Sequence, residues 1–308
     1  MAEAATTPVV PYLQTPTVLQ TTVFTELPEA LRTSHPASGK NEHFLEGPSF
    51  DAAGNLYCVD IPAGRIYRIS PAGDWQVVSE YGGQPNGLKF HRDGRIFVAD
   101  RAQGIVVVDP TSGEASVLCA GPRPGERFKG LNDLIFAGNG DLYFTDQGRS
   151  GLQDPSGVVY RIRSGETAPE PIISNVPSPN GLVFNMRETE LFVAVTRANA
   201  VWRVELTDPL HRCGLYVQLP SAGPDGLALD ADGNVVVAHP TGGLVWVYSK
   251  RGAPLYAIPS CRGDMPSNIA YGDDDGRTLY IVESRTCSIL TTRLPTAGKP
   301  MFGPARQE

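Results

Sequence analysis

Short runs of apolar residues alternate along this chain with turns that contain glycine and aspartate. One such unit begins at Asp225, continues into Gly-Leu-Ala-Leu-Asp at 226–230 and turns at 231–234 before the run Val-Val-Val-Ala-His at 235–239. Two short apolar runs separated by a turn with glycine are typical of a β-hairpin. The pattern therefore predicts an antiparallel pair of strands with an acidic residue immediately before the first strand.

This hairpin unit recurs six times. The units can be aligned on the apolar residue that ends each first strand, namely Phe50, Phe90, Phe136, Phe184, Leu229 and Tyr271. The alignment brings one polar residue of each unit into the same register: Glu46, Asn86, Asn132, Asn180, Asp225 and Ser267. These six residues follow one another at intervals of 40 to 48 residues, and a repeat of about 40 to 50 residues made only of strands is typical of a β-propeller. The sequence therefore predicts an all-β, six-bladed β-propeller in which the six polar side chains line a central channel.

Each unit continues into further predicted strands. The second strands are expected at 56–60, 96–100, 142–146, 191–195, 235–239 and 279–283, and the third strands at 64–69, 104–108, 158–162, 200–204, 243–248 and 288–292. Fourth strands are expected at 75–78, 115–118 and 255–258. The segment 18–27 also alternates, and we expect it to pair with the last strand and close the ring. The predicted organisation is a flexible N-terminal arm over 1–16 and a single propeller domain over 17–308.

The composition limits the partners of this fold. The chain has 308 residues, 41% of them hydrophobic, which is enough to bury a large core. Its formal net charge is -7, whereas a nucleic-acid backbone or an anionic membrane surface attracts a basic protein. We therefore expect no nucleic-acid partner and no membrane partner, and small uncharged or cationic ligands stay open.

Targeting signals and cysteine usage indicate the compartment. The first forty residues contain no basic segment and no continuous apolar segment, and no later run approaches the roughly 20 apolar residues needed to span a bilayer. The five cysteines lie far apart without a Cys-x-x-Cys pair, so they suggest neither a disulfide framework nor a thiolate metal site. We expect buried, reduced thiols in a soluble protein of the cytoplasm.

A second register lies in the returning strand of each hairpin, at the rim where the first strand began. It consists of Asp60, Asp100, Asp146, Val195, His239 and Glu283. Five of these six side chains are ionisable, so the rim is a candidate for a catalytic or binding site. An acidic residue at the end of a strand is also commonly a turn or cap residue, so both interpretations stay open.

The first register carries a more specific chemistry. It contains two carboxylates, Glu46 and Asp225, and three amides, Asn86, Asn132 and Asn180, so all five donors are oxygens. Two carboxylates close to one axis repel each other unless a cation lies between them. Hard oxygen ligands favour Ca²⁺, with Mg²⁺, Mn²⁺ or Zn²⁺ as alternatives. The register therefore predicts one divalent metal ion, and a polar channel filled with water is the alternative.

Several short motifs follow one another along the chain: Phe-Leu-Glu-Gly-Pro at 44–48, Pro-Asn-Gly-Leu at 85–88, Arg-Phe-Lys-Gly-Leu-Asn-Asp at 127–133, Tyr-Phe-Thr-Asp at 143–146, Pro-Asn-Gly-Leu at 179–182, Pro-Asp-Gly-Leu at 224–227, Ala-His-Pro at 238–240 and Leu-Tyr-Ile-Val-Glu at 279–283. In this order they resemble the gluconolactonase, regucalcin (senescence marker protein) and luciferin-regenerating-enzyme family. The resemblance runs from about 44 to 294. It implies a six-bladed propeller with one catalytic divalent ion in the channel, whose ligands would be Glu46, Asn132, Asn180 and Asp225.

Two departures from related propellers narrow the resemblance. Relatives similar to diisopropylfluorophosphatase have a further aspartate three residues after the metal-binding one, where this chain has Ala228, so a second structural calcium is not expected. Strictosidine synthase and its relatives lack the four metal ligands, so the complete set in this chain disfavours them. Arg127 resembles an arginine that contacts substrate in the microbial gluconolactonases, although a solvated loop arginine is the alternative.

The function expected from this reading is metal-assisted hydrolysis of a lactone to a hydroxy acid, with a small lactone or ester as the partner. Asp225 is the candidate base, and Glu46 can exchange roles with it. Asn86, Arg127 and Asn132 would bind and orient the substrate, and His239 would relay a proton. The alternatives are a phosphotriesterase-like hydrolase and a non-hydrolytic, metal-binding or pathway-accessory propeller.

Overall fold

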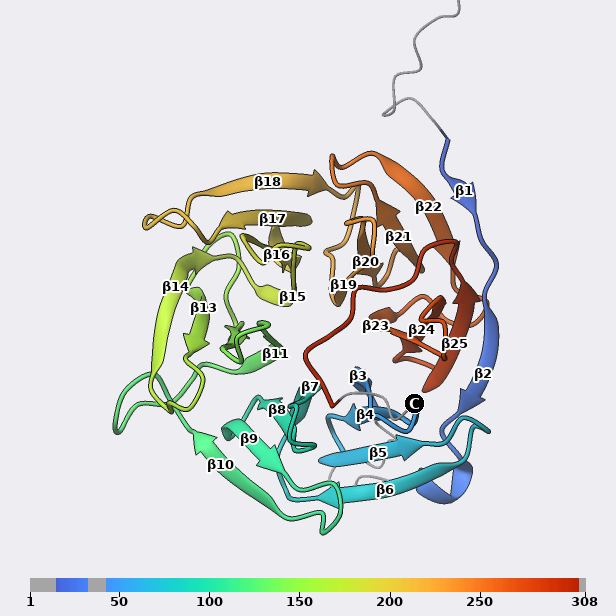
Figure 1. Cartoon of the computed structure of the whole chain (residues 1–308), viewed down its shortest axis with the longest axis horizontal. Helices are drawn as coiled ribbons and strands as arrows, with labels where there is room; N and C mark the ends of the chain where they lie inside the picture. The colour runs from blue at the N-terminus through green and yellow to red at the C-terminus, as the bar shows by residue number, and fades with distance from the viewer. Residues whose placement is uncertain (1–14, 33–42, 305–308) are drawn as a thin grey trace, which may run out of the picture.

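The computed structural model describes residues 15–32 and 43–304. In that part of the chain the strands form six sheets that stand around a central axis (Figure 1). Five sheets have four strands and one has five. The predicted six-bladed β-propeller is confirmed.

Each blade contains four antiparallel strands, the first of which lies at the axis. The innermost strands are β3 (Leu45–Phe50), β7 (Pro85–Phe90), β11 (Leu131–Phe136), β15 (Pro179–Phe184), β19 (Leu227–Leu229) and β23 (Pro266–Gly272). The second strands are β4 (Leu56–Asp60), β8 (Ile96–Asp100), β12 (Leu142–Asp146), β16 (Glu190–Val195), β20 (Val235–His239) and β24 (Thr278–Glu283). The third strands are β5 (Arg65–Ile69), β9 (Gly104–Val108), β13 (Gly157–Ile162), β17 (Ala200–Glu205), β21 (Leu244–Tyr248) and β25 (Ser288–Arg293).

The outermost strands are β6 (Trp75–Glu80), β10 (Ala115–Cys119), β14 (Pro169–Val176), β18 (Cys213–Gln218), β22 (Pro254–Pro259) and β2 (Thr22–Glu26). The sequence pattern did not predict β14 and β18. Both are edge strands that expose many of their side chains, and β14 contains two prolines. An edge strand tolerates polar residues and proline because one side of it makes no ladder hydrogen bonds. Its apolar signal is therefore weak.

The N-terminal segment closes the ring. Strand β2 pairs antiparallel with β25, with Thr22 opposite Thr291, so the predicted closure is confirmed. The short strand β1 (Thr17–Val18) also pairs, parallel to β22 of the neighbouring blade, which the pattern did not predict. The predicted flexible arm over 1–16 lies outside the described residues except for its last two positions.

The core lies between neighbouring blades, where the apolar faces of adjacent sheets meet. The rings of Tyr143 in β12 and Phe184 in β15 contact each other edge to face, with centroids 5.0 Å apart. Apolar residues of β12, β16 and β20 are buried on both faces, as expected for strands in the middle of packed sheets. This packing holds the six inner strands at defined positions around the axis.

All five cysteines are free thiols, as expected. Cys58, Cys119 and Cys287 are buried, whereas Cys213 and Cys261 are exposed. The expectation of burial was therefore wrong for these two residues. Cys213 lies in the edge strand β18 and Cys261 in the loop after β22.

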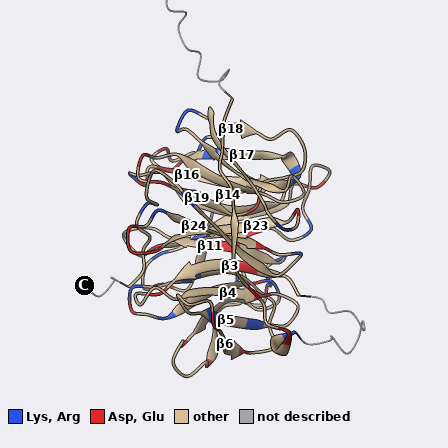
Figure 2. Cartoon of the chain, turned by 90° about the vertical axis from the view of Figure 1, so that its right-hand side faces the viewer, with Lys and Arg blue, Asp and Glu red and all other residues tan. Residues whose placement is uncertain are grey.

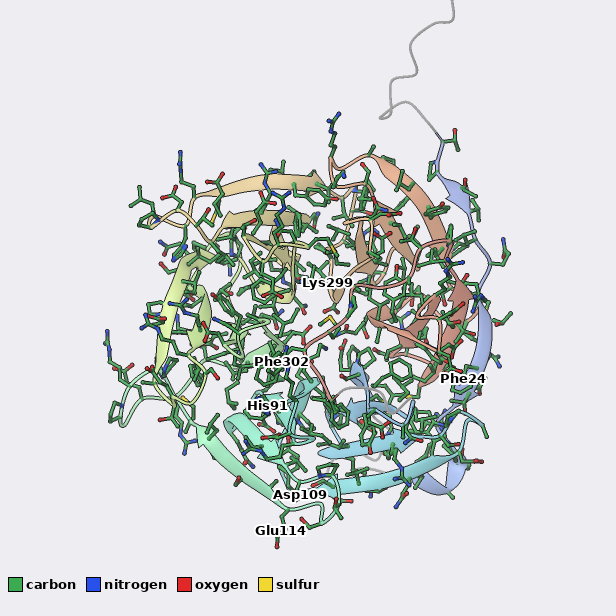
Figure 3. All side chains as sticks on the ribbon, in the orientation of Figure 1. Phe24, His91, Asp109, Glu114, Lys299 and Phe302 are labelled. Carbon is green, nitrogen blue, oxygen red and sulfur yellow. The ribbon has the colours of Figure 1, made fainter. Side chains whose placement is uncertain are left out.

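After β25 the chain crosses one end of the channel (Figure 1). Backbone hydrogen bonds hold the start of the segment 297–304 against the end of β19 and the turns that follow β19 and β23, including one of 2.8 Å from Lys299 N–H to the carbonyl of Leu229. Phe302 packs against Phe136 and His91, with ring centroids 5.2 and 5.3 Å away. Lys299 and Phe302 lie close to the axis in Figure 3. The C-terminal segment therefore covers the channel end at which the inner strands finish.

Charged residues of both signs occur in the loops at the two ends of the strands (Figure 2). The described residues include no helix long and apolar enough to cross a bilayer. Two short 3-10 helices, Glu29–Leu31 and Thr196–Ala198, are the helical elements of the described chain.

Candidate functional site

The six residues of the first register, hereafter the register residues, lie where the inner strands begin. At that point the regular pairing between the inner and second strands is interrupted. In five blades the ladder between the inner and second strands shifts there, as between Glu46 and Ser49 or between Pro179 and Leu182. A β-bulge turns a side chain out of its regular alternation. In the fifth blade β19 begins only at Leu227, and the backbone N–H of Asp225 donates to Ala238 O over 3.0 Å. These irregularities direct the register residues toward the channel.

Glycine follows the register residue in four blades and permits the inner strands to approach one another. A Cβ added at Gly47 would lie 2.5 Å from Asn86 O, and one added at Gly181 would lie 2.5 Å from Asp225 O. Gly47 also has a positive φ of 57°, which a residue with a side chain rarely adopts. These Asn-Gly, Glu-Gly and Asp-Gly pairs therefore bring neighbouring register residues together around the axis.

Glu46 is buried and has only neutral donors around its carboxylate. Its Oε2 accepts hydrogen bonds from Asn268 Nδ2 at 2.9 Å and from the backbone N–H of Gly47 at 3.0 Å. Burial raises the pKa of Glu46 to about 7, although hydrogen bonds from Ser267, Asn268 and Gly47 oppose the shift. The carboxylate of Asp133 adds to the rise through its negative charge. The negative charge of ionised Glu46 is therefore compensated only by neutral hydrogen-bond donors.

Asp225 also lacks a positive charge that would compensate its ionised carboxylate. Burial raises its pKa well above the usual range, and the negative charges of Glu46 and Asp133 raise it further, while a hydrogen bond with Asn180 lowers it. Among the described residues no lysine, arginine or histidine forms an ion pair with Asp225 or Glu46. Glu46 is buried and Asp225 half-buried, and carboxylates withdrawn from water without a counter-charge are costly. The site would become stable with both groups ionised if a cation were bound.

The two amides of the predicted metal set are oriented by their NH₂ groups. Asn132 Nδ2 donates to Gln147 Oε1 over 3.0 Å, and Asn180 Nδ2 donates to Thr196 Oγ1 over 3.2 Å. The Oδ1 atom of Asn180 is buried and has no hydrogen-bond partner in the described structure. Buried polar atoms are rarely left unpaired, and a hard cation binds such a carbonyl oxygen. Together with the uncompensated carboxylates, this oxygen fits the predicted divalent ion.

The charged donors alone do not define a metal centre. Within the described residues no group of three or more His, Cys, Asp or Glu side chains is placed to hold a metal ion. The candidate set has only two carboxylates, those of Glu46 and Asp225, and depends on the amide oxygens of Asn132 and Asn180 for the rest.

The remaining predicted substrate residues lie at the same end of the channel. Asn86 is buried in the inner strand β7 with an exposed fraction of 4%. No hydrogen bond to its side-chain amide occurs among the described residues, so the amide can serve a ligand. Arg127 is exposed and lies in the loop that leads into β11, four residues before the strand begins. Its contact with substrate stays a prediction.

The second register anchors the loops that enter the inner strands. Four of its carboxylates, those of Asp60, Asp100, Asp146 and Glu283, accept hydrogen bonds from backbone N–H groups of the segment before the inner strand of their own blade. The donors are Phe44, Gln84, Lys129, Gly130 and Met265, at 2.7 to 3.1 Å. The structure thus shows these acidic residues in the capping role that the sequence had left open.

His239 occupies the corresponding position in the fifth blade. It is buried, its Nε2 lies at the carbonyl oxygen of Ser221, and Trp246 Nε1 donates to its Nδ1 over 3.3 Å. These two contacts define a neutral imidazole with its proton on Nε2. Since Ser221 begins the segment that leads to Asp225, His239 positions this segment as the carboxylates do in other blades. Its role as a proton relay stays a prediction.

Two residues of the site were not predicted from the sequence. Asp133 and Asn268 occupy the position that glycine holds in the other four blades, directly after the register residue. Asp133 acts on both Glu46 and Asp225 through its charge, and Asn268 donates to Glu46. The departure from glycine at this position is the signal that could have identified them.

Comparisons with known proteins show which sequences and folds this chain is similar to. A family model described as the SMP-30/gluconolactonase/LRE-like region matches residues 44–285. Lactonase drp35 of Staphylococcus epidermidis is 30% identical over 250 residues, which cover 76% of this chain and 72% of the relative.

Solved structures share the fold. The gluconolactonase XC5397 from Xanthomonas campestris has a TM-score of 0.73 and 25% identity, and the match covers 82% of this chain and 87% of that chain. The calcium-binding protein regucalcin from Agrobacterium tumefaciens has a TM-score of 0.74 and 19% identity, with coverage of 96% and 100%. At 19% identity, the likeness to regucalcin shows the fold alone.

Proposed function

Because this chain belongs to the SMP-30/gluconolactonase/LRE-like family, as its motifs predicted, we propose that it is a hydrolase that opens a lactone to a hydroxy acid with the help of one divalent metal ion. Relatives named lactonase and gluconolactonase support the reaction class. The observation that carries the metal-assisted form is the pair of uncompensated carboxylates, Glu46 buried and Asp225 half-buried, beside the unpaired Oδ1 of Asn180.

Glu46, Asn132, Asn180 and Asp225 would hold the ion. When bound, the ion would supply charge stabilisation for the lactone carbonyl oxygen as that oxygen becomes negative. Ca²⁺ is the preferred candidate because all four donors are hard oxygens, and Mg²⁺, Mn²⁺ and Zn²⁺ are alternatives. The calcium-binding regucalcin with the same fold supports this choice.

The protein's own side chains would carry out the proton transfers and the positioning. Asp225 would accept a proton from the attacking water, and Glu46 is the alternative acceptor. Asn86 would donate to or accept from a ring substituent of the lactone, because its amide is not engaged elsewhere in the described structure. Arg127 and Asn132 would complete the contacts with substrate at the mouth of the channel.

Hydrolysis of a panel of substrates tests this proposal directly. The purified protein would be supplied with aldonolactones, aliphatic lactones, aryl esters and phosphotriesters, and acid release would be followed by pH-stat with chelator and after Ca²⁺ is restored. We expect lactone turnover that chelation abolishes and Ca²⁺ restores. Turnover of phosphotriesters alone would favour the phosphotriesterase-like alternative, and bound metal without any turnover would favour a non-hydrolytic role.

A further inference from the structure

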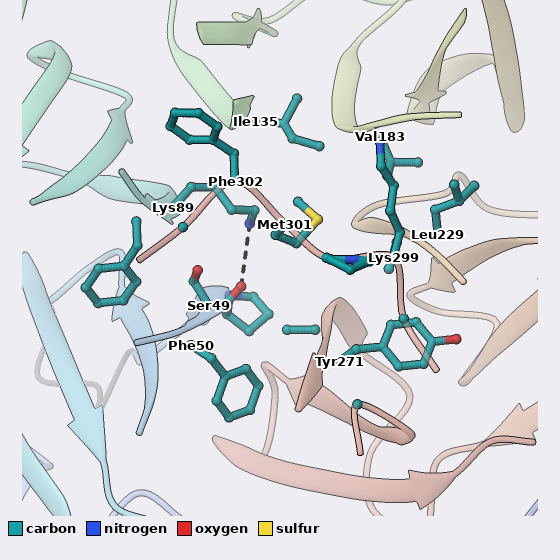
Figure 4. Close-up of a pocket in the computed structure, with 18 of the residues that line it drawn as sticks. Ser49, Phe50, Lys89, Ile135, Val183, Leu229, Tyr271, Lys299, Met301 and Phe302 are labelled. Carbon is teal, nitrogen blue, oxygen red and sulfur yellow. Dashed lines mark hydrogen bonds between the residues drawn. The ribbon is translucent and has the colours of Figure 1, made fainter. Parts of the chain in front are cut away.

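A cavity lies at the channel end opposite to Glu46, Asn180 and Asp225. It has a volume of about 510 Å³ and is lined by residues from the last half of all six inner strands and by the C-terminal segment 297–304. Figure 4 shows this segment running across the cavity. Small-molecule sites commonly measure about 300 to 1,000 Å³, so the cavity has room for a ligand of its own.

The wall of this cavity is mainly apolar. Its apolar side chains come from different blades and from the C-terminal segment, and they include Phe50, Ile135, Val183, Leu229, Met301 and Phe302. Apolar walls with a few convergent polar groups are typical of sites for organic ligands. An apolar or aromatic molecular body would fit this part of the cavity.

One ammonium group points into the cavity from the wall itself. Lys89 lies in strand β7, and its Nζ donates to the backbone carbonyls of Leu88 at 3.0 Å and of Pro48 at 3.5 Å. Figure 4 shows this ammonium within the cavity, next to the Ser49 side chain of β3. No carboxylate forms an ion pair with Lys89 in the described part of the chain, whereas Lys299, which also lines the cavity, pairs with Glu188 at 3.2 Å.

The acidic residues that line the cavity lie at its rim rather than in its wall. Asp51 follows β3, and Asp274 and Asp275 follow β23. The carboxylate of Asp51 accepts hydrogen bonds from the backbone N–H groups of Ala53 and Asn55 within its own turn. Asp275 forms an ion pair with Arg293 at 2.5 Å. Among the charged residues of the inner strands that line the cavity, Lys89 therefore has a side chain that faces the cavity and forms no ion pair in the described structure.

We propose that this cavity is a second binding site, distinct from the register residues, for a small amphipathic carboxylate. The carboxylate would be bound by Lys89 Nζ and Ser49 Oγ, since an ammonium held in an apolar site gains from a charge-assisted hydrogen bond. The apolar body of the ligand would pack against the walls and under Phe302. The segment 297–304 forms the cover, and Gly298 permits it to lie directly on the Tyr271 ring, because a Cβ there would collide with that ring.

Calorimetry on the full-length protein tests the proposal with octanoate and 3-phenylpropanoate as probes and 1-octanol as the neutral counterpart. We expect at least one of the two carboxylates to bind, and octanoate to bind about tenfold more tightly than 1-octanol if the charge-assisted bond forms. Lys89→Met keeps the length and the apolar stem of the side chain and should abolish this preference. Lys250→Met removes an exposed lysine outside the cavity and should leave the preference unchanged.

Two further variants separate this site from the proposed metal site and from misfolding. Ala228→Leu should reduce the binding of all three probes by filling the cavity, and Asp225→Ala should leave octanoate binding intact. Circular dichroism would verify that each variant is folded. The proposal is overturned if neither carboxylate binds, if Lys89→Met binds octanoate as tightly as the unmodified protein, or if Asp225→Ala loses octanoate binding, since the probe would then occupy the metal site.

Discussion

Asn268 Nδ2 lies 2.9 Å from Oε2 of Glu46, although the two residues are 222 positions apart in the chain. This hydrogen bond joins the last blade to the first at the candidate metal site. Asn268 Oδ1 accepts the backbone N–H of Ile269 at 2.8 Å, which fixes the orientation of the amide. The bond therefore holds the Glu46 carboxylate in place and links the closure of the propeller to the geometry of the site.

Asn268→Ala should destabilise the protein by about 1 to 3 kcal/mol, because it removes a buried donor from a carboxylate that has no charged partner. Urea unfolding monitored by circular dichroism would measure the free energy of unfolding. Asn139→Ala, in the turn before β12, is the control for the loss of an exposed asparagine. Equal unfolding free energies for Asn268→Ala and the unmodified protein would contradict the structural role of this bond.

Asp225→Asn should have opposite effects on stability with and without the ion. In chelator the variant should be more stable than the unmodified protein, since it lacks a half-buried carboxylate close to Glu46 and Asp133. With Ca²⁺ the order should reverse, because binding to the folded state stabilises it and the variant has lost a charged ligand. Thermal melts in both conditions and elemental analysis would decide. Full metal occupancy and activity in Asp225→Asn would contradict the ligand assignment.

Asn86→Ala should keep the metal and lose part of the turnover. A hydrogen bond to the substrate contributes about 1 kcal/mol, so kcat/KM should fall roughly fivefold, or more if a buried partner is left unpaired. Steady-state kinetics on the best lactone together with metal analysis would test this. A loss of metal would instead place Asn86 among the ligands.

The chelated protein should lose stability as the pH rises through neutrality. Burial raises the pKa of Glu46 from 4.5 to about 7 in the folded state, so the folded protein holds this proton more tightly than the unfolded chain. The resulting stabilisation is complete below pH 4.5 and disappears as the pH rises through about 7. The difference in unfolding free energy between the unmodified protein and Glu46→Gln, measured against pH in chelator, isolates this contribution. A pH-independent difference would rule it out.

Exchange of the metal ion should change turnover without a matching change in melting temperature. An ion that stabilises developing charge on the carbonyl oxygen acts through its charge density and its effect on the acidity of water. An ion that only braces the propeller would affect folding through occupancy alone. Lactone turnover with Ca²⁺, Mg²⁺, Mn²⁺ and Zn²⁺ at matched occupancy would separate these roles. Unchanged turnover by the fully metal-free protein would end the metal-assisted interpretation.

The sequence by itself determined the number of blades and the register of the candidate site. Each blade repeats the same local signals, an apolar run, a turn with glycine and a second run, so alignment of the repeats placed Glu46, Asn132, Asn180 and Asp225 at equivalent positions. Strands buried between two sheets, such as β12 and β20, had the expected bounds. Their patterns are strong because both of their faces are apolar.

Contacts between blades were decided only by the tertiary structure. The influence of Asp133 on Glu46 and the hydrogen bond from Asn268 to Glu46 depend on how closely neighbouring inner strands approach. The sequence of a single repeat contains no information about this distance. The role of the second register followed from backbone donors in loops of irregular length. The edge strands β14 and β18 and the C-terminal segment over the channel have weak patterns of their own, because their positions depend on packing against other blades rather than on local periodicity.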